Sequence, residues 1–588
     1  MSELISPSQI AKAIKLDGLG RLGTAVGWGL MHLLSLKKIN NIYSRIEHLE
    51  GLDFINAIID ELNIDFDIPK EDLKRIPQNG PFITVSNHPL GGIDGILLLK
   101  IILEQRKDFK VFSSFILKNT PQLQNYLIEI KNEDEKISAL KNAFNYLAEG
   151  HGLGIFPAGE VSTYKDGKLI VDKAWDDKAL KLIYKANVPV IPVYFHGRNS
   201  RLFYLLSKIH PILRTAKLPS EAISDMKRNI KVRIGKPITA KTQESFTDEK
   251  LLGDFIRKKT YLLSKTLQKR GIKELINIKP LVETKRKPII GPVPIEKLKA
   301  DILKLRKKGK LLFNKEKYEV FLSDSADMPH LLQEIGRLRE ITFREVGEGT
   351  NKEIDLDKYD KYYKHLVLWD KEQFKIVGAY RMGLGCEIFD KYGIKGFYLS
   401  ELFTFEPELY DMMSKSIEMG RAFIVKEYQQ KAFPLFLLWR GIVHTTFRYP
   451  NLEYLIGPVS ISDKFSNFSK SLIIEFMKSY FYDPYTAQYV KPKKAFKVKL
   501  KDEDKTFIFN TTNENLNKFD KLIDELEPGN LKIPILLKKY IKQNARLISF
   551  NVDPNFNNSI DGLMYIKISD LPEETVKPVL EEFEQQFK

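Results

Sequence analysis

The stretch PFITVSNHPLGGIDGILLL, residues 81–99, decides how the first part of this chain is interpreted. Its two ends are apolar runs of the kind that form a buried strand and then a helix or a second buried segment. Between them lie one imidazole and one carboxylate, His88 and Asp94, with glycines that allow a tight turn. A histidine held by a nearby aspartate can act as a general base, because the carboxylate fixes the tautomer and stabilises the imidazolium. The alternative is an ordinary strand-to-helix turn, in which Asp94 caps the helix and His88 is a structural hydrogen-bonding residue.

Two later segments extend the pattern: GIFPAGEVST at residues 154–163 and VPVIPVYFHGRNS at residues 188–200. Strand, NHxxxxxD, strand, FPxGxxS and an apolar VPVIPV run, in this order, resemble the glycerolipid (lysophospholipid) acyltransferase family. The resemblance covers roughly residues 65–238. It implies that His88 is the catalytic base and that Asp94 orients it. It also implies a substrate-binding set drawn from both motifs, namely Asn87, Gly159, Glu160 and Ser162.

The motifs depart from the family pattern in two places. Five residues separate His88 from Asp94, where the family usually has four, and Ala158 stands where the family's FPEG motif has Glu. These departures resemble the branch that acylates lyso-aminolipids rather than glycerol phosphates. Arg198, which follows the last apolar run, is a further substrate-binding candidate, since arginine binds phosphate or carboxylate in a bidentate manner. The alternative for Arg198 is a solvated surface arginine.

The composition limits the class of protein. With 588 residues the chain is too long for a single core, so two or more domains are expected. A formal net charge of +17 favours an anionic partner, which could be a membrane surface, acyl carrier protein or nucleic acid. No helix-turn-helix, zinc-finger or RNP pattern accompanies the basic segments, so we do not expect nucleic acid. The single cysteine, Cys386, excludes an internal disulfide, and without paired metal-ligand spacing no metal site is expected.

The N-terminal region, residues 1–64, is expected to form helices. Its most apolar run, LGTAVGWGLMHLLSL at residues 22–36, is too short to span a bilayer and is followed by two lysines. It fits an amphipathic helix lying in the membrane interface, or equally a buried helix of the first domain. No signal peptide is recognisable, and we expect peripheral attachment at the cytoplasmic face of the inner membrane.

The expected fold class is α/β with two domains. Strands alternate with helices up to residue 195, which favours an α/β sheet in a first domain at residues 1–284. Lysine, arginine and proline then accumulate, so residues 285–310 are predicted to be a basic linker. A second α/β domain at residues 311–588 is expected to contain strands at residues 318–323 and 397–403.

A second group of functional candidates lies between residues 339 and 421. It comprises Arg339, Phe343, an acidic run at residues 355–360, Arg381 and the motif EMGRAFI, in which Glu418 precedes Arg421 by three residues. This pattern resembles the ornithine-type N-acyltransferases, whose fold is GNAT-like and related to the acyl-homoserine-lactone synthases. The resemblance covers about residues 314–570. The alternative for the Glu–Arg pair is a structural salt bridge one helical turn apart.

N-acylation of this kind needs no covalent enzyme intermediate. A thioester carbonyl must be positioned against an amine that has lost a proton. A carboxylate can hold or deprotonate the ammonium group, and Glu418 and Glu401 are the candidates for this role. Basic groups can hold the carboxylate of the amino acid, and Arg381 and Arg421 are the candidates for that role or for structural pairing.

Two acyltransferase-like halves in one chain imply consecutive steps. The C-terminal domain would join a 3-hydroxyacyl group from acyl carrier protein to the α-amine of ornithine or glycine, and the N-terminal domain would then esterify the 3-hydroxyl. Acyl carrier protein or CoA would carry the acyl donor, and no cofactor is expected. One alternative is a lysophospholipid (1-acylglycerol-phosphate) acyltransferase with an accessory GNAT-like domain. The other is a basic, non-enzymatic membrane-binding protein.

Overall fold

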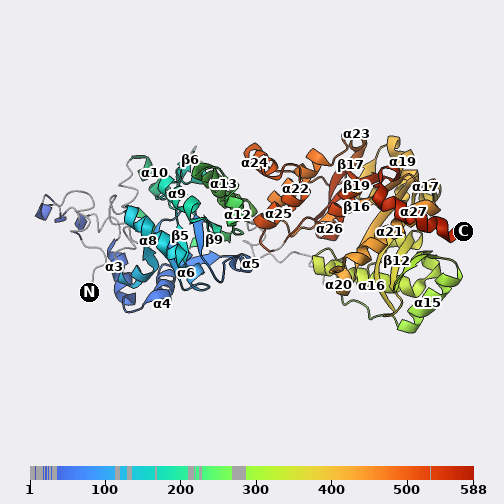
Figure 1. Ribbon diagram of the computed structural model, residues 1–588, viewed down its shortest axis with the longest axis horizontal. Coiled ribbons are helices and arrows are strands. Elements are labelled where there is room, and N and C mark those ends of the chain that lie inside the picture. The colour runs from blue at the N-terminus through green and yellow to red at the C-terminus, as the bar shows by residue number, and fades with distance from the viewer. Residues whose placement is uncertain are drawn as a thin grey trace. The chain divides into compact units, whose positions relative to one another are not determined.

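The computed structural model describes residues 36–112, 120–128, 136–165, 169–209, 217–218, 220–223, 228–267, 287–529 and 531–587, together with residues 7, 18, 20–22, 24–25 and 28–29. These residues form two compact units, each with its own sheet and helices (Figure 1). One unit is Met1–Leu267 with Asp524–Asn530, and the other is Gln268–Ile523 with Leu531–Lys588. Both units are α/β, so the predicted fold class is confirmed.

The N-terminal unit contains a seven-stranded sheet in the order β1-β9-β8-β2-β5-β3-β4. All neighbouring strands are parallel except β8 and β9. All five residues of β2 are buried, because this strand lies between β5 and β8 and both of its faces are covered. The strands are β1 Ile64–Asp67, β2 Phe82–Ser86, β3 Phe109–Phe112, β4 Leu127–Ile128, β5 Gly152–Ile155, β8 Val190–His196 and β9 Arg228–Ile234.

Helices cover both faces of this sheet and complete two apolar cores. One core includes Phe54 of α4 and Leu97 of α6, and the other includes Leu180 of α9 and Ile256 of α13. Gly152 is the first residue of β5. A larger residue would not fit there, because a Cβ would lie 2.6 Å from the ring of Phe82. The described helices and the remaining strands are α3 Leu36–Ile46, α4 Gly51–Glu61, α5 Lys70–Leu73, α6 Gly92–Leu103, α8 Lys136–Ala148, β6 Thr163–Lys165, β7 Leu169–Val171, α9 Asp177–Ala186, α10 Arg201–Ile209, α12 Ala240–Gln243 and α13 Glu249–Leu262.

The C-terminal unit contains an eight-stranded sheet in the order β10-β11-β12-β13-β15-β16-β19-β18. Its strands are antiparallel except for β15 and β16, which pair in parallel over only three positions, from Ser416 with Tyr454 to Glu418 with Ile456. The strands are β10 Leu311–Lys315, β11 Tyr318–Asp324, β12 Lys364–Asp370, β13 Lys375–Leu384, β15 Ser416–Ile424, β16 Tyr454–Ile461, β18 Arg546–Asp553 and β19 Ser559–Lys567.

The two faces of this second sheet are covered by different helices. α15 and α16 pack on the face that carries Phe321 and Val367. α21 packs on the opposite face, where a Cβ added at Gly441 would lie 2.9 Å from the side chains of Leu366 and Val320. The principal helices and the strand pair beside the sheet are α15 Ile295–Lys307, α16 Pro329–Val346, α17 Gly385–Tyr392, α18 Leu399–Leu402, β14 Phe403–Phe405, α19 Tyr410–Ser414, α20 Lys426–Gln429, α21 Ala432–Arg448, α22 Asn467–Tyr480, α23 Pro484–Ala487, β17 Val490–Pro492, α24 Asp502–Thr512, α25 Leu516–Leu526, α26 Ile535–Lys542 and α27 Glu573–Phe587.

The predicted basic linker is wrong over much of its length. α15 occupies Ile295–Lys307, and its residues Leu298, Ile302 and Leu305 are buried in the apolar core of the C-terminal unit. They recur at helical spacing, so one face of the basic segment is a core face. The predicted domain boundary at residue 284 lies outside the described residues.

The predicted division into continuous domains also differs from the structure. Asp524–Asn530 belongs to the N-terminal unit, although the prediction placed it in the second domain. There the backbone carbonyl of Leu526 accepts a hydrogen bond from Arg233, at 2.9 Å. Charge pairing adds to this contact, since Lys259 and Glu525 form an ion pair at 2.5 Å.

The remaining predictions about elements have mixed outcomes. α3 and α4 lie within the N-terminal region that was expected to be helical, whereas most of residues 22–36 lie outside the described residues. The strand expected at residues 397–403 is wrong, because Leu399–Leu402 forms the short helix α18. Within the described part of the chain, no helix is both long enough and apolar enough to cross a membrane.

Candidate active sites

The predicted His–Asp pair lies where the loop after β2 meets the start of α6. The Nδ1 atom of His88 lies 3.2 Å from the Oδ2 atom of Asp94, which is fully buried in the first turn of α6. The same oxygen accepts the backbone N–H of Leu90 at 2.8 Å. Gly91 completes the turn with φ +75°, and a Cβ there would lie 3.0 Å from Leu218. Asp94 therefore fixes both the loop and the imidazole.

The electrostatics of this pair suit a histidine base. Burial raises the pKa of Asp94, and the hydrogen bond and charge of His88 oppose that rise. An imidazolium at His88 would therefore be stabilised when the ring accepts a proton. Because Nδ1 faces Asp94, Nε2 is the ring nitrogen left for a substrate. The His88 side chain is 15% exposed, and it lines a cavity.

This cavity has a volume of about 450 Å³. His88, Gly159 and Glu160 line it together with apolar side chains, including Val111 and Leu182. Gly159 has φ +65°, a conformation that glycine adopts without strain. A mainly apolar cavity beside a histidine base can take an acyl chain and present its thioester to an attacking oxygen.

Three other predicted substrate-binding residues have different surroundings. The amide group of Asn87 bonds the backbone of Phe195 twice, at 2.9 and 2.7 Å, and thereby ties β2 to β8. The hydroxyl of Ser162 is buried and donates to Asp172 at 2.6 Å. Both side chains are thus used inside the protein, which does not fit the predicted contact with substrate. Arg198 is exposed and does not line the cavity.

The second site surrounds Glu418, which β15 places in the interior of the C-terminal unit. One oxygen of Glu418 accepts the hydroxyl of Tyr363 at 2.6 Å, and the other accepts the backbone N–H of Leu399 at 3.2 Å. Burial raises the pKa of Glu418 to about 7, although the hydrogen bond from Tyr363 and the charge of Arg381 oppose the rise. A carboxyl group with this pKa can exchange a proton near neutral pH, as a general base must.

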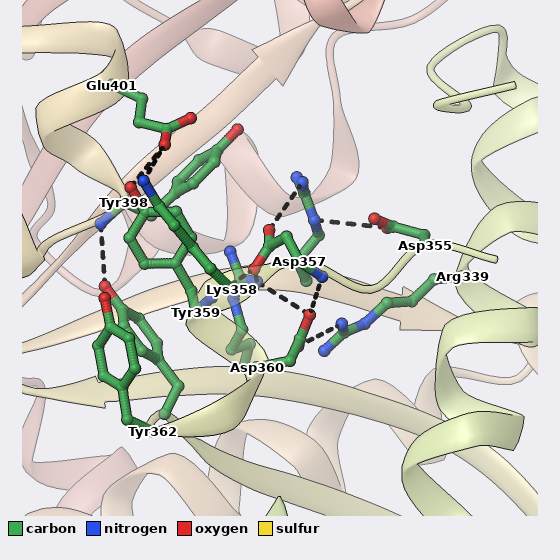
Figure 2. A network of polar contacts seen from close by, with 12 residues as sticks. Arg339, Asp355, Asp357, Lys358, Tyr359, Asp360, Tyr362, Tyr398 and Glu401 are labelled. Atoms are coloured by element: carbon green, nitrogen blue, oxygen red, sulfur yellow. Dashed lines mark hydrogen bonds and ion pairs between the residues drawn. The ribbon is translucent and has the colours of Figure 1, made fainter. Parts of the chain in front are cut away.

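Arginines from three separate elements meet the acidic run at residues 355–360: Arg339 and Arg381 are buried, and Arg421 is partly buried. Figure 2 shows Arg339 beside Asp360. Arg339 of α16 donates to Asp360 at 2.8 Å, and Arg381 of β13 donates to Asp357 at 2.6 Å. Burial disfavours the charged form of Asp360, but the charges of Arg339 and Arg381 outweigh this effect and lower its pKa. The pairs thus keep several charges inside the protein in their ionised forms.

Arg421 reaches the same network through a distortion of β15. Its φ is +50°, which is uncommon for a residue other than glycine, and the β13–β15 register shifts between Ala379 and Arg381. Bulges of this kind redirect a side chain. Arg421 lies 3.4 Å from Asp355 and has no ion pair with Glu418 in the described structure. The predicted alternative of a Glu418–Arg421 salt bridge on a helix is therefore wrong.

Some guanidinium donors in this network lack a hydrogen-bond acceptor. Among the described residues these buried nitrogen atoms make no hydrogen bond: Nε and Nη2 of Arg339, Nε of Arg381 and Nε of Arg421, the last of which still forms an ion pair with Asp355 at 3.4 Å. Unsatisfied buried donors are energetically unfavourable, and a ligand that accepts their hydrogens would remove that penalty. The carboxylate of an amino acid is an acceptor of the right chemistry.

Two further candidates of the second site are placed less centrally. Glu401 is partly exposed and accepts the hydroxyl of Tyr359 at 2.7 Å (Figure 2). Burial opposes its ionisation, but the hydrogen bonds from Tyr359 and Lys358 lower its pKa, so it is a weaker base than Glu418. Phe343 packs against the apolar core under α15 and α16, which indicates a structural role.

Comparison with known proteins finds a matching family for the range that contains each group of residues. Residues 13–270 match the family described as Acyltransferase, and residues 338–439 match the Acetyltransferase (GNAT) domain. Glycine N(alpha)-acyltransferase of Bacteroides thetaiotaomicron is 30% identical over 280 residues, which are 46% of this chain and 81% of that protein. The protein of the same description from Phocaeicola vulgatus is 31% identical over 287 residues, 46% of this chain and 84% of that protein. This chain belongs to the aminolipid acyltransferases.

The chain is also similar to a relative that is named for O-acylation rather than N-acylation. Lyso-glycine lipid O-acyltransferase of Phocaeicola vulgatus is 27% identical over 242 residues, which are 40% of this chain and 86% of that protein. This aminolipid acyltransferase therefore combines an acyltransferase domain and a GNAT domain, and the combination supports both N-acylation and O-acylation.

The structure adds residues of this aminolipid acyltransferase that sequence patterns did not assign. Tyr363 holds Glu418, and its pKa lies well above the usual value because it is buried and next to that carboxylate. Tyr398 lies between Arg381 and Arg421, whose guanidinium groups are 5.3 and 5.1 Å from its ring. Asp172 accepts hydrogen bonds beside His88. Their neighbours are distant in sequence, so no local pattern revealed them.

Proposed function

We propose that the GNAT domain transfers a 3-hydroxyacyl group from acyl carrier protein to the α-amine of an amino acid, and that the acyltransferase domain then esterifies the new 3-hydroxyl. The observation that carries this proposal is the presence of two separate proton-accepting sites, His88–Asp94 and Glu418, in different units of one chain. Glycine is the first amino acid to test, because the N-acylating relatives are named for it. Ornithine is the second.

In the first step, Glu418 takes a proton from the substrate ammonium, and the free amine attacks the thioester carbonyl. A nitrogen–carbon bond forms, the carbon–sulfur bond breaks, and the pantetheine thiol leaves with a proton. The unsatisfied donors of Arg339, Arg381 and Arg421 provide hydrogen bonds for the carboxylate of the amino acid. Positioning the amine against the thioester supplies much of the rate enhancement.

In the second step, Nε2 of His88 takes the proton of the 3-hydroxyl while the oxygen attacks a second thioester. An oxygen–carbon bond forms, the carbon–sulfur bond breaks, and the imidazolium returns its proton to the leaving thiolate. Asp94 holds the ring in one tautomer and stabilises its charge. Ala158 lines the cavity where the glycerol-phosphate enzymes carry Glu, which fits an acceptor without phosphate.

The direct test uses the purified full-length chain with 3-hydroxyacyl carrier protein, acyl carrier protein loaded with a second chain, and either glycine or ornithine. Mass spectrometry should show the monoacyl lipid first and the diacyl lipid later with at least one of the two amino acids. Lysophosphatidic acid serves as the competing acceptor. Acylation of lysophosphatidic acid alone, without amide formation from either amino acid, would favour the lysophospholipid acyltransferase alternative instead.

We further propose peripheral attachment to anionic lipid at the cytoplasmic face of the inner membrane. The net charge of +17 supports electrostatic attraction. In the N-terminal unit, α10 buries Phe203 and Tyr204 but leaves Leu202 and Leu205, one helical turn apart, 51% and 57% exposed. An exposed arginine, Arg201, begins this helix. Apolar side chains beside a cation fit a bilayer interface.

The double variant Leu202→Gln/Leu205→Gln should sediment less with anionic vesicles than the parent chain. If the two leucines are partly buried in lipid when the protein binds, their loss removes about 2 kcal/mol of binding free energy. This corresponds to roughly a 30-fold lower partition coefficient. The matched control is Leu251→Gln, because Leu251 is 52% exposed on α13 of the same unit. Added salt should weaken the binding of all variants. Equal sedimentation of the parent and the double variant would exclude α10 as the lipid contact.

A further inference from the structure

Asp172 follows β7 and is buried, with 3% of its surface exposed. Its carboxylate accepts three hydrogens: the backbone N–H of His88 at 3.2 Å, the hydroxyl of Ser162 at 2.6 Å and the indole N–H of Trp175 at 3.4 Å. It therefore joins the loop that carries His88 to the loop that follows the FPAGE motif.

The backbone of Asp172 is fixed independently of its side chain. Its N–H donates to the hydroxyl of Tyr261 at 2.8 Å, and its carbonyl accepts a hydrogen bond from Arg257 at 2.6 Å. Both partners belong to α13. A side-chain substitution at residue 172 leaves these backbone bonds in place, so it tests the carboxylate alone.

The main chain of His88 is held at both of its polar groups. Asp172 accepts its N–H, and the N–H of Ser162 donates to its carbonyl at 2.8 Å. The ring is held separately by Asp94, at 3.2 Å. Two carboxylates thus divide the task, since Asp94 orients the imidazole and Asp172 sets the position of the backbone from which it projects.

We propose that Asp172 is a positioning residue for O-acylation, which fixes the His88 backbone and the Ser162 loop relative to each other so that the imidazole faces the acyl cavity. Neither Asp172 nor Ser162 lines that cavity. The effect of Asp172 therefore acts through His88 and falls on the chemical step, whereas the binding of lyso-lipid is unchanged. This inference rests on the proposed role of His88 in ester formation.

The test measures ester formation by the full-length chain from supplied lyso-lipid and acyl carrier protein loaded with an acyl group. In Asp172→Asn, an amide N–H₂ replaces one acceptor oxygen, and a misplacement of the base by about 1 Å corresponds to roughly a 100-fold lower rate. We expect kcat to fall between about 10-fold and 100-fold, with KM for lyso-lipid within about twofold of the parent. N-acylation by the same preparation should be unchanged, which controls for the amount of folded protein.

A double-mutant cycle separates positioning from general destabilisation. Ser162→Ala should lower kcat by about 3-fold to 10-fold. Adding it to Asp172→Asn should lower kcat little further, because Ser162→Ala removes the hydrogen bond that the loss of the carboxylate charge in Asp172→Asn has already weakened. His151→Ala is the control, because His151 pairs with Asp108 and does not line the cavity.

Several results would overturn the proposal. One is a folded Asp172→Asn protein with parental kcat, and another is a raised KM with unchanged kcat, which would indicate substrate binding. If Asp172→Asn does not fold, parental kcat in both Ser162→Ala and Trp175→Phe overturns it instead. Full ester formation by His88→Ala is a different outcome, since it contradicts the proposed function itself.

Discussion

Replacing His88 by alanine should abolish ester formation and leave amide formation intact, so that the monoacyl aminolipid accumulates. His88 is the imidazole beside the acyl cavity in the N-terminal unit, and Glu418 lies in the other unit. Loss of a general base lowers the rate by about 10²–10⁴-fold. Liquid chromatography with mass spectrometry of lipids from cells expressing the variant gives the ratio of monoacyl to diacyl product directly.

Asp94→Asn should act in the same direction with a smaller effect, because the proton acceptor remains while the preferred tautomer and the charge that stabilises the imidazolium are lost. His151→Ala is the matched control, since His151 also lies beside an aspartate, at 3.1 Å from Asp108, but outside the cavity. It should retain parental ester formation. Parental amounts of diacyl lipid in His88→Ala would show that another group accepts the hydroxyl proton.

Replacing Glu418 by glutamine should lower amide formation by about 10²–10⁴-fold, while ester formation from supplied monoacyl lipid continues. The glutamine keeps the size of the side chain and an oxygen for the hydroxyl of Tyr363, but it cannot accept a proton. The measurement is the initial rate of amide formation from 3-hydroxyacyl carrier protein and glycine. Glu334→Gln is the control, because Glu334 is another buried carboxylate, paired with Arg337.

The pH dependence gives a second test of Glu418. Its pKa is raised to about 7, and only the ionised form accepts a proton, so the active form is lost as pH falls through 7. The rate of amide formation should therefore drop about tenfold per pH unit below this value and level off above it, once the ionisation of the substrate amine is allowed for. The limb near pH 7 should disappear in Glu418→Gln. A parental pH profile in that variant would exclude Glu418 as the base.

The local features of the first site could be predicted from sequence because they lie close together in the chain. His88 lies in the loop after β2 and Asp94 in the first turn of α6, and apolar runs mark both of these elements. Asp172 could not be found in this way. It meets His88 only because the β6–β7 hairpin returns the chain to the site 84 residues later. Sequence spacing carries no information about such a contact.

The second site was predicted as a group of residues, but its pairings were not. Arg339, Arg381 and Arg421 come from α16, β13 and β15, and only the folded sheet brings their guanidinium groups to one acidic run. The alternative of a Glu418–Arg421 salt bridge was wrong because residues three apart are neighbours on a helix, whereas these two lie on the strand β15. Residues 397–403 were misassigned for a related reason, since a short apolar run suits a strand or a buried helix equally well.

The positive φ at Gly91 bears on how this site can be inherited. Within a loop that has five residues between histidine and aspartate, the turn at residue 91 favours glycine, and any larger residue there would also press on Leu218. Loop length and this glycine should therefore change together over evolution. A related protein with only four residues between histidine and aspartate does not need glycine at this position. One that keeps five residues but has lost the glycine should have lost its O-acyltransferase activity. Distant genes could accordingly be sorted by the pattern NHxxGxxD before any of them is expressed.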